Sequence, residues 1–186
     1  MALPHYTQSK ASINKYEPVY QNLFELTLIS PVAIGGTFDT PLMLQHIESI
    51  EGVDGTNPNI DAITQKFKFS DRSFAGMPAQ TYIDLQVVAT VNLNRSNEAY
   101  VYKQIRDWYK LAYDPITAEM GLKIDYTGSA IVTQYNRKGD IFRKVTFKDV
   151  FVTGQLGFTN SLSVENPEAA KVTFTLRTDY WTEELA

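Results

Sequence analysis

Few side chains in this sequence are arranged for catalysis or metal binding. His5 and His46 are the only histidines, and neither lies in a pattern that pairs a nucleophile with a base or spaces the ligands of a zinc site. Asp54, Asn57 and Asp61 carry oxygen atoms that suit calcium. Their spacing differs from that of an EF-hand loop, so this Gly-, Asn- and Pro-containing segment is predicted to be a turn-rich loop.

The other polar patterns also give no indication of an enzyme. The acidic pair Glu183–Glu184 is typical of a solvated surface. The GxxxxGK, GxGxxG and HExxH patterns do not occur, and the absence of cysteine excludes disulfides and thiolate metal sites. The sequence therefore predicts no catalytic residue, no cofactor site and no metal site.

Composition favours one soluble domain behind a short arm. The chain has 186 residues, a formal net charge of -4 and no run of Lys or Arg, so binding to nucleic acid through its phosphates is not favoured. The sequence has no secretory signal and no apolar run long enough to span a membrane, which predicts a cytoplasmic product. Residues 1–19 are expected to form an arm that either frays or docks through its tyrosines, and residues 20–186 a single domain.

The final strand, Lys171–Trp181, is the element around which a core is predicted to form. Its residues alternate with the two-residue period of a strand, and its three threonines disfavour a helix. The face predicted to pack on the core carries Val172, Phe174, Leu176, Thr178 and Tyr180. The opposite face carries Arg177, Asp179 and Trp181, and a Trp in that position is expected to need a cover.

A long hairpin is predicted in the middle of the chain. Ile63–Phe69 and Thr81–Leu93 are its expected arms, with Phe67 and Phe69 on one face. Phe74 and Met77 lie in its expected tip. Apolar side chains at a tip either fold back on their own domain or meet another one, and both outcomes stay open.

The sequence also predicts one helix and four further strands. The predicted fold class is therefore α+β, mostly β: an antiparallel sandwich or barrel-like subunit with the hairpin and one packed helix. The helix is indicated by the apolar series Val101, Ile105, Trp108 and Ala112, with candidate N-caps at Asn94, Ser96 and Asn97 and an end at Asp114–Pro115. The further strands are expected in Gln21–Ser30, in Leu42–Ile50 (where a short helix is the alternative), in Ser129–Tyr135 and in Ile141–Val152, which needs a bulge near Lys148–Asp149.

Several of these segments resemble one protein family when they are taken in order. NLFEL (22–26) opens the first strand, SAIVTQYNRKGD (129–140) forms a strand and a basic turn, and TFTLRTDYW (173–181) closes the chain. Between them, the helix closes with the DWY-like aromatic turn (107–109), a few residues before its predicted end at Asp114–Pro115. This series is similar to the tail tube proteins of contractile-tailed bacteriophages, over most of residues 22–181.

The resemblance implies a structural protein of the phage virion that assembles in the bacterial cytoplasm. Its subunits would form hexameric rings that stack into a hollow tube inside a sheath, above a baseplate, and viral DNA would pass through the lumen without specific binding. No cofactor and no membrane are expected. Candidate contacts between subunits or rings are Tyr6, Tyr16, Tyr20, Phe67, Phe69, Phe74, Met77, Arg177, Asp179 and Trp181.

Two other interpretations are kept. The chain could be the similar inner-tube ring protein of a bacterial secretion or contractile injection system, which shares this fold. It could instead be a carbohydrate-binding β-sandwich in which Trp181, Tyr180 and Tyr82 stack on sugars.

Overall fold

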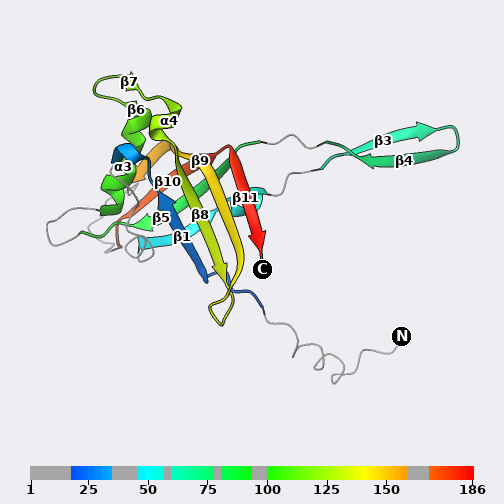
Figure 1. Cartoon of the computed structure of the whole chain (residues 1–186), viewed down its shortest axis with the longest axis horizontal. Coiled ribbons are helices and arrows are strands. Elements are labelled where there is room, and N and C mark those ends of the chain that lie inside the picture. The colour runs from blue at the N-terminus through cyan, green and yellow to red at the C-terminus, as the bar shows by residue number, and fades with distance from the viewer. Residues whose placement is uncertain (1–17, 35–45, 57–59, 78–80, 94–99, 159–167) are drawn as a thin grey trace.

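The computed structural model describes residues 18–34, 46–56, 60–77, 81–93, 100–158 and 168–186 (Figure 1). The elements in chain order are β1 (Phe24–Ile29), η1 (Val32–Ile34), β2 (Ile47–Glu51), η2 (Val53–Thr56), β3 (Ala62–Phe67), β4 (Ser70–Ala75), β5 (Ile83–Thr90), α3 (Tyr100–Ala112), β6 (Tyr113–Asp114), β7 (Glu119–Met120), α4 (Lys123–Tyr126), β8 (Gly128–Tyr135), β9 (Ile141–Phe158), β10 (Lys171–Thr178) and β11 (Tyr180–Leu185). A helix long and apolar enough to cross a membrane is not found within these ranges.

Seven strands form one antiparallel sheet in the order β1-β8-β9-β10-β5-β2, and β11 lies beside β9. The long strand β9 belongs to both halves of this sheet, because its first part pairs with β8 and β11 and its later part pairs with β10. The two halves cross and face each other over a shared core (Figure 1). The predicted α+β, mostly β, fold with an antiparallel sandwich is confirmed.

A bulge in β9 joins the two halves. Lys148 pairs with Ser129 and Val150 pairs with Gly128, which leaves Asp149 as an extra residue with φ 53°. An extra residue reverses which side chains point inward, so Val145 and Phe147 before it and Val150 and Val152 after it are all buried. The bulge predicted near Lys148–Asp149 is confirmed.

The core is built from the alternating inward residues of both halves. Leu26, Leu28, Ala130 and Val132 come from the first half, and Ile83, Leu85, Val87, Ala89, Val172, Phe174 and Leu176 from the second. These residues recur at every second position of their strands, as a strand with one face on a core requires. The inward face predicted for residues 172–176 is therefore confirmed.

Helix α3 covers one end of this core. Its buried side chains are Val101, Ile105 and Trp108, which confirms the predicted apolar series at these positions. Trp108 Nε1 donates a hydrogen bond of 2.7 Å to the carbonyl oxygen of Tyr126, so the indole is satisfied although its ring is buried. The candidate N-caps at residues 94–97 lie outside the described residues.

The central hairpin differs from its prediction. Strand β3 pairs with β4, not with β5, and the two form a separate two-stranded sheet that turns at Lys68–Phe69. The predicted second arm, β5, instead pairs with β10 and β2 in the main sheet. The prediction failed because the Lys-Phe turn lacks Gly, Asn and Pro, whereas the following Ser-, Gly- and Pro-containing segment has the composition of a loop.

The C-terminal strand also differs from its prediction. The predicted alternation holds to the buried residue Thr178, and a bend at Asp179 then separates β10 from β11. The bend changes the phase, so Tyr180 is exposed and Trp181 packs against the core. The predicted outward position of Trp181 beside Arg177 is therefore wrong, because the strand passes from one half of the sheet to the other.

Candidate functional site

The described residues contain no arrangement typical of a catalytic or metal site. His46 is buried just before β2, and groups of three or more His, Asp or Glu side chains that could hold a metal ion do not occur within the described ranges. His5 and Asn57 lie outside the described residues. Every buried polar side-chain atom in the described part of the chain has a hydrogen-bond partner, so none of them points to an absent ligand.

Unpaired strand edges are the first feature that points to assembly. Among the described residues, β1 and β2 stand at the two ends of the sheet order, and β11 pairs with β9 alone. An edge strand presents a row of backbone N–H and C=O groups that another chain can complete. These edges are therefore candidate contact sites for another chain.

A groove of about 810 Å³ lies between the two edge strands β1 and β2. Apolar side chains form part of its lining, among them Phe24, Ile47, Ile50 and Val53. Its charged lining residues are all carboxylates, namely Glu48, Glu51 and Asp54. The groove thus has a mixed lining of apolar side chains, polar side chains and three carboxylates, of which Glu48 is paired with Lys171, and it lies between the two end strands of the sheet.

The β3–β4 hairpin is the second feature. Figure 1 shows it projecting away from the sheet, and all twelve of its strand residues are exposed. Its strand register places Ile63 opposite Phe74 and Phe67 opposite Ser70 on one face, which we call the aromatic face. Arg72 shares this face, and its guanidinium carbon lies 5.7 Å from the centre of the Phe67 ring. The opposite face is polar, with the hydroxyls of Thr64 and Ser73 3.3 Å apart.

The structure brings only some of the predicted contact residues together. Phe67 and Phe74 share the aromatic face, Phe69 lies in its turn with 91% of its surface exposed, and Met77 is 98% exposed beyond β4. Tyr20 lies apart from them and faces Arg137, whose guanidinium carbon is 5.5 Å from the ring centre. The predicted contacts at residues 6 and 16 lie outside the described residues.

Arg177 is held within its own subunit on the outer face of the second half of the sheet. Its Nε and Nη2 donate to the two carboxylate oxygens of Asp84, each at 2.7 Å, and its guanidinium carbon lies 3.9 Å from the centre of the Tyr82 ring. The hydrogen bonds to Asp84 raise the pKa of Arg177. This bidentate pair fixes β10 against β5.

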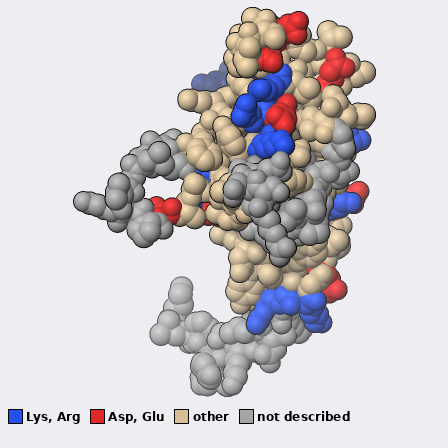
Figure 2. Space-filling view, turned by 90° about the vertical axis from the view of Figure 1, so that its left-hand side faces the viewer, with Lys and Arg blue, Asp and Glu red and all other residues tan. Residues whose placement is uncertain are grey.

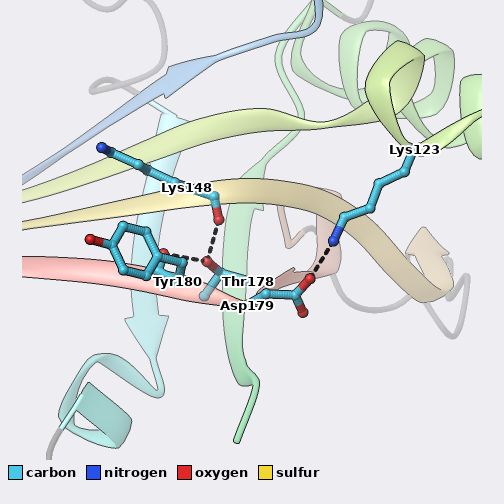
Figure 3. Close-up of polar contacts among 5 residues, drawn as sticks. All are labelled: Lys123, Lys148, Thr178, Asp179 and Tyr180. Atoms are coloured by element: carbon cyan, nitrogen blue, oxygen red, sulfur yellow. Dashed lines mark hydrogen bonds and ion pairs between the residues drawn. The ribbon is translucent and has the colours of Figure 1, made fainter. Parts of the chain in front are cut away.

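The bend at Asp179 is fixed by polar contacts on both sides (Figure 3). The Thr178 hydroxyl lies 2.7 Å from the carbonyl oxygen of Lys148 and 3.0 Å from that of Tyr180. Asp179 accepts a hydrogen bond from Lys123, and this bond raises the pKa of that lysine. The predicted contact residues Arg177, Asp179 and Trp181 therefore have partners within the subunit and do not form one exposed surface. Trp181 also does not share an exposed platform with Tyr82 and Tyr180, which the sugar-binding interpretation required.

Sequence reasoning missed two features. The groove depends on which strands end the sheet, and no local pattern gives that order. The second is a set of exposed apolar side chains around η1, β7 and α4, comprising Val32, Ile116, Met120, Leu122 and Ile124. Four of these five residues occur within PITAEMGLKI (115–124), and this density of apolar residues in a Gly-containing segment was a usable signal.

Charges on the face shown in Figure 2 are interspersed. Basic and acidic side chains lie next to one another there, with no large surface of one sign. Such a face provides no continuous positive strip for a nucleic-acid backbone.

The chain matches no protein-family model and no curated protein sequence. Its fold matches a chain in the tube-terminating cap of the anti-feeding prophage with a TM-score of 0.59 and 16% identity, covering 92% of this chain and 93% of the other. It also matches a chain of the PVC sheath-tube complex, an extracellular contractile injection system in its extended state, with a TM-score of 0.57 and 13% identity over 95% and 97% of the two chains. It also matches a chain of the PVC sheath/tube terminator in its extended state, with a TM-score of 0.58 and 12% identity, covering 91% of this chain and 98% of the other.

The fold is therefore the one found in tube, cap and terminator assemblies of contractile injection systems. At these identities the comparisons define the fold and leave the activity to be argued from the molecule. The predicted resemblance to tube proteins of contractile particles is confirmed at the level of the fold.

Proposed function

We propose that this protein is a structural subunit that assembles into the inner tube of a contractile tail. The observation that carries the proposal is the fold match over more than nine-tenths of both chains, to assemblies described as tube, cap and sheath-tube complexes. A match over the full length means that few additional elements are left to supply a different activity.

The subunit's own features support assembly by repetition. Within the part of the chain that the structure describes, the two end strands β1 and β2 and the outer side of β11 have no strand beside them. When such edges meet head to tail around a rotation axis, the contacts close into a ring and leave no edge exposed. The resemblance to tail tube proteins implies six subunits in each ring, and stacked rings would then form the tube.

The particle is proposed to be a bacteriophage, with the protein in the tail of a virion assembled in the host cytoplasm. Sheath and baseplate proteins are its expected neighbours, and viral DNA its passenger. The interspersed charges on the face in Figure 2 are compatible with a passenger that is not held, because a continuous basic surface would retain the phosphates.

Two alternatives are favoured by particular observations. The matched assemblies belong to injection systems, so the same subunit could serve a tube that delivers another cargo. In addition, the cap, the tube complex and the terminator match almost equally well, with TM-scores of 0.59, 0.57 and 0.58, so this fold also suits a ring that ends a tube.

Electron microscopy of the purified chain separates these functions. A tube subunit is expected to form six-membered rings that stack into tubes whose length grows with protein concentration. Rings that never stack would assign the terminator function, and a monomer at every concentration and salt would contradict both. Particles isolated with this protein in a tail attached to a DNA-filled head would establish the phage assignment.

A further inference from the structure

We propose that the aromatic face of the β3–β4 hairpin binds in the groove between β1 and β2 of a second copy. This inference rests on the proposed assembly of identical subunits and names the two surfaces that meet. The first argument is that the hairpin is incomplete alone. A two-stranded sheet is marginally stable in water unless one face is covered, and here the aromatic face is exposed.

The two surfaces match in their apolar character. Ile63, Phe67 and Phe74 on the hairpin are 60%, 48% and 51% exposed, and they lie together on one face. The groove offers Phe24, Ile47 and Ile50 between two strand edges. Covering large apolar side chains of this kind removes apolar surface from water, which favours docking of the aromatic face over its exposure.

The two surfaces also match in charge. On the hairpin, Arg72 lies on the aromatic face and Lys68 in the turn, whereas Lys66 lies on the polar face opposite Asp71. Three carboxylates line the groove, of which Glu48 is paired with Lys171 at 2.6 Å, so Glu51, which is exposed, and Asp54, whose exposed side chain lies 3.7 Å from Arg143, carry the negative charge offered to a partner. Opposite charges around an apolar contact steer the partners and fix their orientation.

The geometry favours a second copy over the same chain. Figure 1 shows the hairpin projecting away from the sheet that bears the groove, so the hairpin does not occupy its own groove. A hairpin of one copy in the groove of the next is a head-to-tail contact, which repeats from copy to copy. It would place two added strands beside the incomplete edges β1 and β2.

Cysteine cross-linking tests this contact directly, since the chain has no cysteine of its own. Two single variants are mixed under mild oxidation, Ser70→Cys on the aromatic face and Ser49→Cys in the groove lining. We expect a disulfide-linked dimer of the two variants. Ser73→Cys is the matched control because it lies on the polar face of the same hairpin. Its linkage to Ser49→Cys is expected to be slower by about tenfold or more, because a side chain that points away from the partner does not meet the geometry of a disulfide.

Charge reversal gives an independent measurement on the same contact. Arg72→Glu with Lys68→Glu, or Glu51→Lys with Asp54→Lys, should each slow cross-linking by about tenfold or more, because like charges then face each other. Combining the reversals in two partners, one on each side, should restore the rate. If either double substitution slowed cross-linking only by destabilising its own subunit, combining the two would not restore the rate.

The outcomes separate this proposal from the proposed function. Rings or tubes in the microscope without the Ser70–Ser49 link would overturn the docking and leave the tube function standing. The link without rings would support the docking and contradict the tube function. Equal linkage from the two hairpin faces would show random collision and overturn the docking, and neither rings nor link would overturn both.

Discussion

Gly128 is placed where any side chain would strike the core. It begins β8 under the indole of Trp108, and an added Cβ would lie 2.9 Å from that ring and closer still to the carbonyl oxygen of Ile29. Neither neighbour can give way easily, since one is backbone and the other is a buried aromatic ring.

Gly128→Ala should therefore lower the free energy of unfolding by about 2 kcal/mol or more through overpacking. Urea denaturation of the unassembled subunit measures it. Gly157→Ala is the control, because its added Cβ would meet nothing closer than 3.6 Å and should change stability little. A tolerated alanine at Gly128 would show that β8 does not approach Trp108 as described.

Tyr135 ties the first two strands of the sheet together through its hydroxyl. The hydroxyl donates a hydrogen bond of 2.6 Å to Glu25 on β1, and this bond, followed by burial and the carboxylate charge, raises the pKa of Tyr135. A raised folded-state pKa stabilises the fold fully below the ordinary tyrosine pKa of about 10, and the contribution is lost as the pH rises through the folded value.

Tyr135→Phe should lower the free energy of unfolding by about 1 kcal/mol near neutral pH, the net value of such a bond. The difference in Tm between the wild type and the variant should be constant up to about pH 10 and then shrink. Melting curves between pH 7 and 11 measure it. A difference that grows above pH 10 would contradict the assigned bond.

At the scale of elements, the bend of β9 controls how the two halves of the sheet face each other. Asp149 adopts φ 53°, a left-handed conformation that Asp tolerates better than most residues and that β-branched side chains avoid. The pairing of β9 has two further irregularities, one opposite Tyr135 at its start and one opposite β10 around Gly154, and Asp149 is the one that lies between the buried pairs Val145–Phe147 and Val150–Val152.

Asp149→Val should therefore lower the free energy of unfolding by about 1–2 kcal/mol, the cost of a left-handed conformation for such a residue. Asp149→Gly removes the same charge without that cost and should stay within about 0.5 kcal/mol of the wild type. Chemical denaturation of both variants makes the comparison. If they are equally unstable, the carboxylate and not the conformation matters here.

At the scale of the whole molecule, exposed apolar residues on and just after the hairpin are candidates for contact with another copy. Phe74 is 51% exposed and Met77 is 98% exposed, so neither is part of the core. In an assembly that covers them, they would be enclosed against another copy, where an unpaired charge costs several kcal/mol.

Changing Phe74 and Met77 together to Asp should leave the subunit folded and stop tube growth. Circular dichroism measures the fold and electron microscopy the tubes. Ser73→Asp, on the polar face of the same hairpin, is a control for added charge alone. Loss of the fold in the double variant would show that these side chains belong to the subunit core. Normal tubes would show that Phe74 and Met77 are not assembly contacts.

The core of this protein was predictable from local pattern. The inward residues of β1, β5 and β10, the buried side of α3 and the bulge at Asp149 all follow from the period of apolar residues, because a strand or helix with one buried face must repeat at 2 or 3.6 residues. The bulge in particular follows from a phase change within β9, which an extra residue alone reconciles.

The sequence by itself thus determined the faces of the strands and the class of the fold, since those depend on neighbours a few positions apart. Tertiary structure alone decided that β5 pairs with β10 and β2, that β3 turns back at Lys68–Phe69, and that the bend at Asp179 carries Trp181 onto the core. The choice of a strand's partner depends on burial and hydrogen bonding between segments far apart in the chain. For that reason the groove between β1 and β2, which exists only because these two strands end the sheet, had no local signature.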